Sequence, residues 1–200
     1  MLDISQSGPP NAPESAPAPQ LRRELRSWTR DLAIALGFAL AIIIFLYQPV
    51  KVEGTSMAPL LSDQERIFIN KFVYRFEPID RGDVVVFWYP RDLSKSFIKR
   101  VIGLPGDTVE IRAGRLFING REMNESYVPA SYMDGLSYPP LKIPPGEYFV
   151  MGDHRDSSND SRMFGPVARQ YIYGKAVFAY WPVDHFGSLS LPTTVNAASK

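Results

Sequence analysis

The chain has 200 residues, a formal net charge of +1 at pH 7 and no cysteine. This length suits one compact domain with appended segments, and the near-neutral charge gives no indication of nucleic-acid binding. The lack of cysteine excludes disulfides, a thiolate nucleophile and a cysteine-ligated zinc site, and two histidines are too few for a histidine-rich metal site. We therefore expect no metal site built from cysteines or from a histidine cluster.

The first 30 residues have two distinct compositions. Proline, serine and alanine dominate residues 1–20, and such a segment buries too little apolar surface to offset its chain entropy. Arginines dominate residues 21–30. We expect a disordered proline-rich segment that leads into a basic tail over residues 1–30.

An uncharged run from Leu32 to Val50 follows. It has no polar face and can span a bilayer if Gln48 and Pro49 lie at the interface, so we expect one anchor helix over residues 31–49. A cleaved signal peptide is the alternative, but the long extension before the run and the lack of a small-residue cleavage site after it disfavour that interpretation. Four arginines precede the run, so the positive-inside rule predicts a cytoplasmic N-terminus and an extracytoplasmic remainder.

Short β-branched and aromatic runs fill the rest of the chain and predict a mainly β region. Asn119-Gly120 lies between two such runs and predicts a tight hairpin. Residues 124–146 contain five prolines and are expected to form an extended loop or the edge of a small subdomain. The predicted strands are residues 66–70, 83–89, 96–102, 108–112, 115–118, 121–123, 148–151 and 172–181.

Ser56 lies a few residues after the predicted anchor, in the string Gly54-Thr55-Ser56-Met57-Ala58-Pro59. A nucleophile at this position would act at the bilayer surface, but a serine hydroxyl needs a base to accept its proton. The string is also compatible with a turn in which Ser56 caps a short helix.

Lys99 occurs within the strand-like run Phe97 to Gly103 and could be that base. In a strand, Lys99 would share a face with Phe97 and Val101 while Arg100 points away. A lysine on an apolar face is disfavoured unless it is paired or has a lowered pKa, and desolvation lowers the pKa of an amine. A lysine whose amine reaches solvent from an edge strand is the alternative.

Residues 152–165, Gly-Asp-His-Arg-Asp-Ser-Ser-Asn-Asp-Ser-Arg-Met-Phe-Gly, are rich in short polar and charged side chains. Such side chains can fix an irregular loop through local hydrogen bonds and ion pairs, although a simple polar turn would look the same. The spacing of its acidic residues does not match an EF-hand calcium site.

In this order, the three segments resemble the motifs of bacterial type I signal peptidases, the Ser/Lys proteases that remove signal peptides from exported proteins. The resemblance covers about residues 32–186 and implies that Ser56 is the nucleophile and Lys99 the general base. It further implies that Ser158 orients the lysine amine and that Asp160 and Arg162 hold the loop in shape. The residues implied to line the pocket for a small substrate side chain are Val52, Met57, Leu61, Phe97 and Ile98.

The resemblance implies a mainly β fold. A single N-terminal transmembrane helix would precede a coiled-sheet catalytic domain over residues 50–190, which carries a small inserted β subdomain at about residues 107–146. Residues 191–200 would form a polar C-terminal tail.

The implied function is cleavage of preproteins after a small-x-small sequence by a membrane-anchored endopeptidase. Its partners would be preprotein signal peptides and the lipid bilayer, without nucleic acid, metal or cofactor, in a bacterial plasma membrane or a photosynthetic inner membrane. A non-enzymatic, membrane-anchored β scaffold of an envelope assembly is the alternative from another class.

Gly54 departs from the pattern of some relatives, which have a serine there whose hydroxyl donates to the oxyanion. Two hypotheses follow. The missing donor is replaced by a backbone amide, a water or the Thr55 hydroxyl, or the turn requires a positive φ at residue 54 that only glycine adopts readily.

Overall fold

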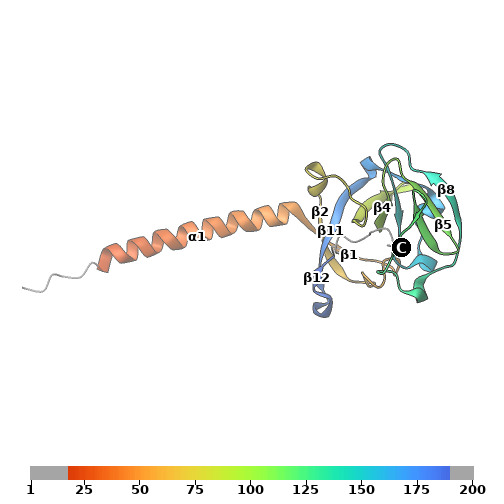
Figure 1. Ribbon diagram of the computed structural model, residues 1–200. Helices are drawn as coiled ribbons and strands as arrows, with labels where there is room; N and C mark the ends of the chain where they lie inside the picture. The colour runs from red at the N-terminus through yellow and green to blue at the C-terminus, as the bar shows by residue number, and fades with distance from the viewer. Residues whose placement is uncertain (1–17, 190–200) are drawn as a thin grey trace, which may run out of the picture. The chain divides into compact units, whose positions relative to one another are not determined.

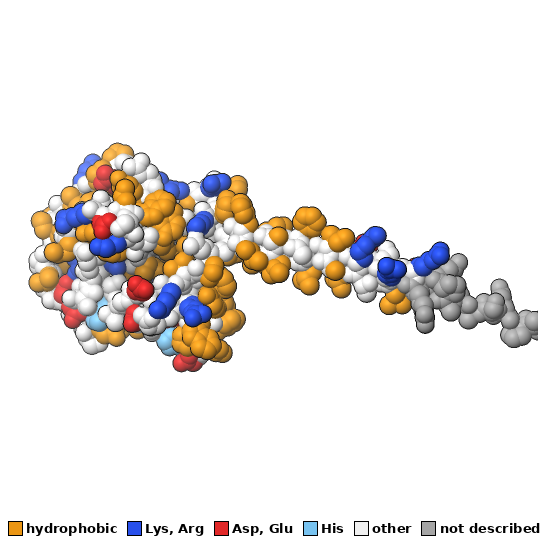
Figure 2. Space-filling view, turned by 180° about the vertical axis from the view of Figure 1, so that it is seen from behind, with side chains coloured by type: hydrophobic (Ala, Val, Ile, Leu, Met, Phe, Trp, Pro, Cys, Tyr) orange, Lys and Arg blue, Asp and Glu red, His pale blue; other side chains and the backbone are white. Residues whose placement is uncertain are grey.

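The computed structural model describes residues 18–189, and the chain divides into two compact units, Met1–Ile43 and Ile44–Lys200. The first unit consists mostly of helix α1, Ala18–Leu46. Its segment Arg23–Leu46 is long and apolar enough to cross a membrane, and none of its most apolar stretch is buried. Figure 2 shows hydrophobic side chains along this stretch on the face in view and basic side chains toward its N-terminal end. A helix from the core of a soluble domain would have buried these side chains.

Both ends of α1 differ from the predicted anchor of residues 31–49. The helix begins at Ala18 and includes the basic stretch, because leucine, arginine and glutamate are strong helix formers and no proline follows Pro19 until Pro49. It ends at Leu46, so residues 47–49 lie in strand β1, Tyr47–Lys51. Pro49 would disrupt a helix interior, and its φ suits an edge strand. The proline-rich residues 1–17 and the tail 191–200 lie outside the described residues.

Strands are the main regular structure of the second unit, as predicted, and all strand pairs in the described residues are antiparallel (Figure 1). The larger sheet has the order β1-β2-β11-β3-β4-β9-β10, and β12 pairs with β11. Its remaining strands are β2 Arg66–Asn70, β3 Val84–Tyr89, β4 Asp92–Gly103, β9 Glu147–Met151, β10 Val167–Ala168, β11 Ile172–Trp181 and β12 Gly187–Ser188.

A second sheet is inserted between β4 and β9 in the chain, within the range expected for the subdomain. Its order is β7-β6-β5-β8, and the predicted Asn119-Gly120 turn joins β6 to β7 with both residues at positive φ. Part of the proline-rich segment forms strand β8, which pairs with β5. The strands are β5 Thr108–Arg112, β6 Arg115–Ile118, β7 Arg121–Glu122 and β8 Tyr138–Lys142.

Short helical turns connect the strands. Helix α2, Ser161–Phe164, lies in the polar loop of residues 152–165. The 3-10 turns are η1 Val73–Arg75, η2 Ala130–Tyr132, η3 Arg155–Ser157, η4 Arg169–Tyr171 and η5 Val183–His185.

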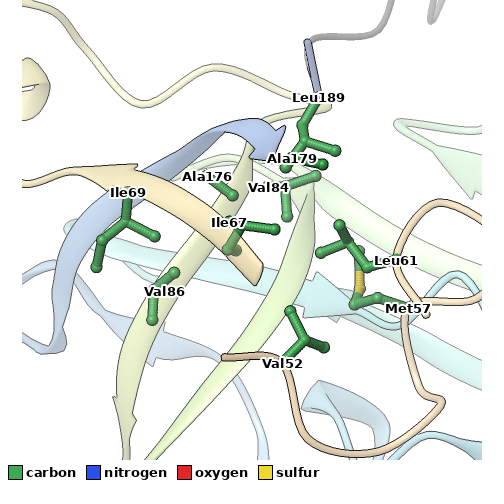
Figure 3. Packing of buried hydrophobic residues seen from close by; sticks show 10 residues of the cluster. All are labelled: Val52, Met57, Leu61, Ile67, Ile69, Val84, Val86, Ala176, Ala179 and Leu189. Carbon is green, nitrogen blue, oxygen red and sulfur yellow. The ribbon is translucent and has the colours of Figure 1, made fainter. Parts of the chain in front are cut away.

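Three residues of the core cluster in Figure 3 lie within five positions of Ser56 in the chain: Val52, Met57 and Leu61. Met57 and Leu61, from the segment between β1 and β2, point toward one another and pack with Val52 against the larger sheet. A separate cluster joins the second sheet to β4 and β9. The segment that carries Ser56 is therefore held on the larger sheet by buried side chains on both sides of the serine. The full cluster is Val52, Met57, Leu61, Ile67, Ile69, Val84, Val86, Ala176, Ala179 and Leu189.

Candidate active site

Ser56 and Lys99, 43 residues apart in the chain, meet at hydrogen-bond distance. Lys99 Nζ lies 2.7 Å from Ser56 Oγ and donates to the Ile98 carbonyl at 3.0 Å. Ser56 is in the turn between β1 and β2, whereas Lys99 is in β4 and only 4% exposed. A buried amine in contact with a serine hydroxyl can accept its proton, provided that the amine is neutral.

The surroundings of Lys99 favour the neutral amine. Burial lowers the pKa of Lys99 to about 8, although the negative charges of Asp160 and Asp153 act in the opposite direction. No carboxylate in residues 18–189 comes within ion-pair distance of the lysine amine. Desolvation therefore outweighs the two distant charges.

Gly54 has a φ of +90°, and its N–H donates to Asp63 Oδ1 at 2.7 Å. The bond from Gly54 also lowers the pKa of the Asp63 carboxyl. A Cβ built on Gly54 would meet no atom within 4 Å, so space does not limit this position. The backbone conformation limits it instead, because a residue with a side chain is strained at positive φ. Of the two hypotheses for Gly54, this geometry favours the requirement for positive φ.

Asp160 and Arg162 fix the polar loop. Asp160 is fully buried and accepts hydrogen bonds from the Gly152 N–H and from Arg162 Nε and Nη2, at 3.1, 2.9 and 2.8 Å. It also caps α2 by accepting from the Arg162 N–H. Paired hydrogen bonds between a guanidinium and a carboxylate hold both groups in one orientation. The structure thus brings these two predicted loop residues together.

Ser158 belongs to the same loop but is not bonded to Lys99. Its Oγ is buried and has no hydrogen-bond partner among the described residues. It faces Gly152, where an added Cβ would overlap both the Ser158 hydroxyl and the Ser56 carbonyl. Only glycine therefore allows the loop to approach the Ser56 turn so closely. The orienting role of Ser158 stays a prediction.

A cleft of about 300 Å³ opens beside Ser56 and Lys99. Three of the five predicted pocket residues, Val52, Phe97 and Ile98, line it. Met57 and Leu61 do not, because they are 1% and 0% exposed and complete the core cluster beneath the turn. The other lining residues are Val50, Lys51, Glu53, Ile67, Val86, Ser96, Asn159 and Tyr173.

Known proteins are similar in sequence to this chain over most of its length. Residues 25–181 match the family described as signal peptidase, peptidase S26. A signal peptidase I of Leptolyngbya laminosa is 37% identical over 96% of this chain and 98% of its own length. The chain belongs to the signal peptidase family S26. A signal peptidase I of Bacillus amyloliquefaciens is 41% identical over 78% of this chain and 84% of its own length. A crystal structure of a signal peptidase I from Enterococcus faecalis is 35% identical, has a TM-score of 0.45 and matches 50% of this chain and 97% of its own.

Membership of the S26 family makes this chain a serine endopeptidase and disfavours the scaffold alternative. Signal peptidases I are membrane-associated enzymes that cleave signal peptides, and α1 gives this chain one apolar helix suited to membrane association. The predicted enzyme class is thereby confirmed.

Four further charged residues support the loop, and none of them was among the site residues predicted from the sequence. Arg100 is fully buried, and its Nε and Nη2 donate to Asp153 at 2.8 and 2.5 Å. Arg155 donates through Nη1 and Nη2 to Glu125 at 2.6 and 2.5 Å. Arg100 carries a signal that could have been used: it is a second charged residue within an apolar strand, where an unpaired charge is costly. Glu125 carries no such signal in the sequence, because its partner Arg155 lies 30 residues away in the chain.

Proposed function

We propose that this member of the S26 family is a membrane-anchored endopeptidase that removes signal peptides from preproteins, with Ser56 as nucleophile and Lys99 as general base. The observation that carries the proposal is the 2.7 Å separation of Ser56 Oγ from a buried lysine amine whose pKa is lowered to about 8. At pH 7 about a tenth of such amines are neutral, against less than ~0.1% for an unperturbed lysine.

In the proposed reaction, Ser56 Oγ attacks the carbonyl carbon of the scissile bond as its proton moves to Lys99 Nζ. The C–N bond of the tetrahedral intermediate then breaks, and the Lys99 ammonium gives the proton to the leaving amine. A water that transfers its proton to Lys99 attacks the resulting ester, and the proton returns to Ser56 Oγ. Lys99 therefore acts first as base and then as acid in both halves.

The negative charge that develops on the carbonyl oxygen needs a donor. The Ser56 N–H has no acceptor among residues 18–189, so it is free to donate to that oxygen. In other serine proteases, one such donor contributes roughly 2.7 to 4 kcal/mol to the rate.

We also assign supporting roles in the polar loop. Asp160 and Arg162 hold its backbone, and Ser158 orients the Lys99 amine. The Ser158 hydroxyl is buried without a partner, which costs about 1–3 kcal/mol, and a hydrogen bond to the amine would remove that cost.

Substrate selection follows from the cleft. Val52 and Ile98 give it apolar walls next to Ser56, and its volume of about 300 Å³ is enough for a short peptide segment. We propose that these walls and Phe97 accept the small residues of a small-x-small site. Helix α1 spans the membrane with its basic N-terminal end in the cytoplasm and residues 50–189 on the outer side.

The test is processing of a preprotein by Ser56→Ala and Lys99→Ala. Because nucleophile and base act as a unit, each variant should lose about 10⁴-fold or more in kcat while its thermal unfolding stays cooperative. Sequencing the new N-terminus of the product identifies the cleavage site. Near-normal turnover by either variant would rule out the Ser/Lys dyad.

A further inference from the structure

His154 makes two separate contacts with the Ser56 turn. Its backbone N–H donates to the Ser56 carbonyl at 3.1 Å, and its ring Nδ1 lies 3.2 Å from the Thr55 carbonyl oxygen. Two successive carbonyls of the turn are thus held by one residue of the polar loop. The ring contact can be removed by mutation, whereas the backbone contact cannot.

The ring itself is held from two further sides. Its Nε2 lies 3.0 Å from Asp156 Oδ1, and the ring of Tyr132 packs over it with centroids 4.0 Å apart. Both ring nitrogens therefore face oxygen atoms, and with a proton on Nδ1 the ring donates to the Thr55 carbonyl. The two supports restrict the rotation of the imidazole, so that Nδ1 stays directed at Thr55.

The contact with Thr55 acts on the peptide that joins Thr55 to Ser56. The Thr55 carbonyl accepts from the Ala58 N–H at 2.9 Å as well as facing the His154 ring, so its direction is fixed by two groups. In a planar trans peptide the C=O and N–H point in opposite directions. Fixing the Thr55 carbonyl therefore fixes the direction of the Ser56 N–H, which has no acceptor among the described residues.

We infer that His154 is a positioning residue whose ring, by anchoring the Thr55 carbonyl, keeps the Ser56 N–H directed at the carbonyl oxygen of the substrate. The inference rests on the proposed function, because it needs Ser56 to be the nucleophile. It adds a residue that touches neither the substrate nor the reacting atoms. An imidazole close to a serine suggests a general base, but both ring nitrogens are already engaged and Lys99 is in contact with Ser56 Oγ.

The experiment compares His154→Ala with His154→Gln, whose side-chain amide can still donate to the Thr55 carbonyl. The matched control is His185→Ala, which removes the other histidine, a 42% exposed side chain whose Nδ1 lies 3.4 Å from Glu65. For each variant, kcat and KM are measured on one peptide that contains the cleavage site. A peptide aldehyde of the same sequence provides a second readout, because its tetrahedral adduct with Ser56 places an oxygen where the N–H donates.

For His154→Ala we expect kcat to fall about tenfold or more with KM within twofold, and binding of the aldehyde to weaken by a similar factor. His154→Gln should recover part of both losses, and His185→Ala should behave as the unmodified protein. A normal kcat for His154→Ala, or an effect confined to KM, would overturn the inference. So would a loss of kcat with unchanged aldehyde affinity.

If His154→Ala fails to fold, Asp156→Ala replaces it. The Asp156 side chain supports the same ring and is 50% exposed, so we expect its removal to leave the fold intact. A fall in kcat and aldehyde affinity supports the inference, and unchanged values contradict it. Ser56→Ala separates the two proposals. If it retains turnover, the proposed function is wrong, whereas an inactive Ser56→Ala beside a fully active His154→Ala refutes only the role of His154.

Discussion

Lys99 combines two properties that are rarely found together in one lysine: it is buried, and it has no acidic partner among residues 18–189. Asp153 and Asp160, the two charges that act on it, are engaged by Arg100 and by Arg162. Pairing with these arginines offsets much of their effect on the lysine. The loop thereby contains two carboxylates, yet the pKa of Lys99 stays lowered.

The pKa of Lys99 leads to a pH profile. We expect kcat/KM to rise about tenfold per pH unit below pH 8 and to level off above it, because only the neutral amine accepts the proton of Ser56. The measurement is kcat/KM on one peptide from pH 5 to 10, with circular dichroism to verify folding. Lys99→Arg is the control and should be inactive throughout, since guanidinium does not deprotonate. A flat profile would exclude a lysine base.

Gly54 gives the second prediction at this scale. Because its φ is +90° and the space around it is open, Gly54→Ala and Gly54→Ser should each destabilise the turn by about 1–2 kcal/mol and lower kcat to a similar extent. Thermal unfolding and kcat of the two variants, measured together, provide the check. A Gly54→Ser variant with normal or increased kcat would instead show that a hydroxyl can fill an unoccupied donor position.

At the scale of elements, the inserted region holds the polar loop from outside. Residues 125–134 supply three contacts: Glu125 with Arg155, Asp134 with Arg162, and Tyr132 with His154. The first pair is buried on both sides, with side chains 4% and 3% exposed. The region between β7 and β8 thus helps to shape a site to which it contributes no lining residue.

Breaking this buried pair should be costly. Glu125→Gln would leave the Arg155 guanidinium buried without its carboxylate, and we expect a loss of about 3–5 kcal/mol in unfolding free energy with lower kcat. Glu125→Gln combined with Arg155→Met should recover much of the stability, because neither charge of this pair is then left buried without its partner. Denaturant unfolding of the two single variants and the double variant measures the coupling. Strictly additive losses would show that the pair does not act as a unit.

Eight of the twelve strands in residues 18–189 could be predicted because each carries its own pattern, whereas β1, β8, β10 and β12 were not among the predicted strands. Arg66–Asn70 and Thr108–Arg112 have the predicted bounds. The dipeptide Asn119-Gly120 alone is enough to predict its hairpin turn, and both residues have the expected positive φ. The end of α1 was harder to locate, since an apolar run does not show where strand pairing replaces helix. Met57 and Leu61 show a similar limit: apolar side chains next to a serine suit a pocket or a core equally well, and packing against distant strands decides between them.

The meeting of Ser56 and Lys99 could be anticipated from chemistry, because a lysine on an apolar strand face needs an explanation. The ring contact of His154 could not. A histidine in a polar segment predicts nothing about its partner, and the Thr55 carbonyl lies 99 residues away in the chain.

At the scale of the whole molecule, the chain divides into two compact units, and the proposed function gives them separate tasks. Removing residues 1–43 should leave turnover of a short soluble peptide within about twofold. Processing of a preprotein embedded in vesicles should fall at least about tenfold, because the anchor raises the effective concentration of enzyme at the bilayer. Both substrates are assayed with the same preparations. An unrelated apolar helix of equal length is the control and should restore vesicle processing, and equal losses on both substrates would contradict the tethering role.

The connection between α1 and Ser56 also restricts where a bond can be cut. Residues 47–56 span at most about 35 Å when fully extended, and half of them are fixed by residue-by-residue pairing of β1 with β2. If α1 spans the membrane as proposed, this short connection keeps Ser56 within that distance of the end of the helix. The proposed enzyme would then select a site by its position as well as by its sequence: of two identical small-x-small sequences, only one displayed within that distance of the membrane surface is cut.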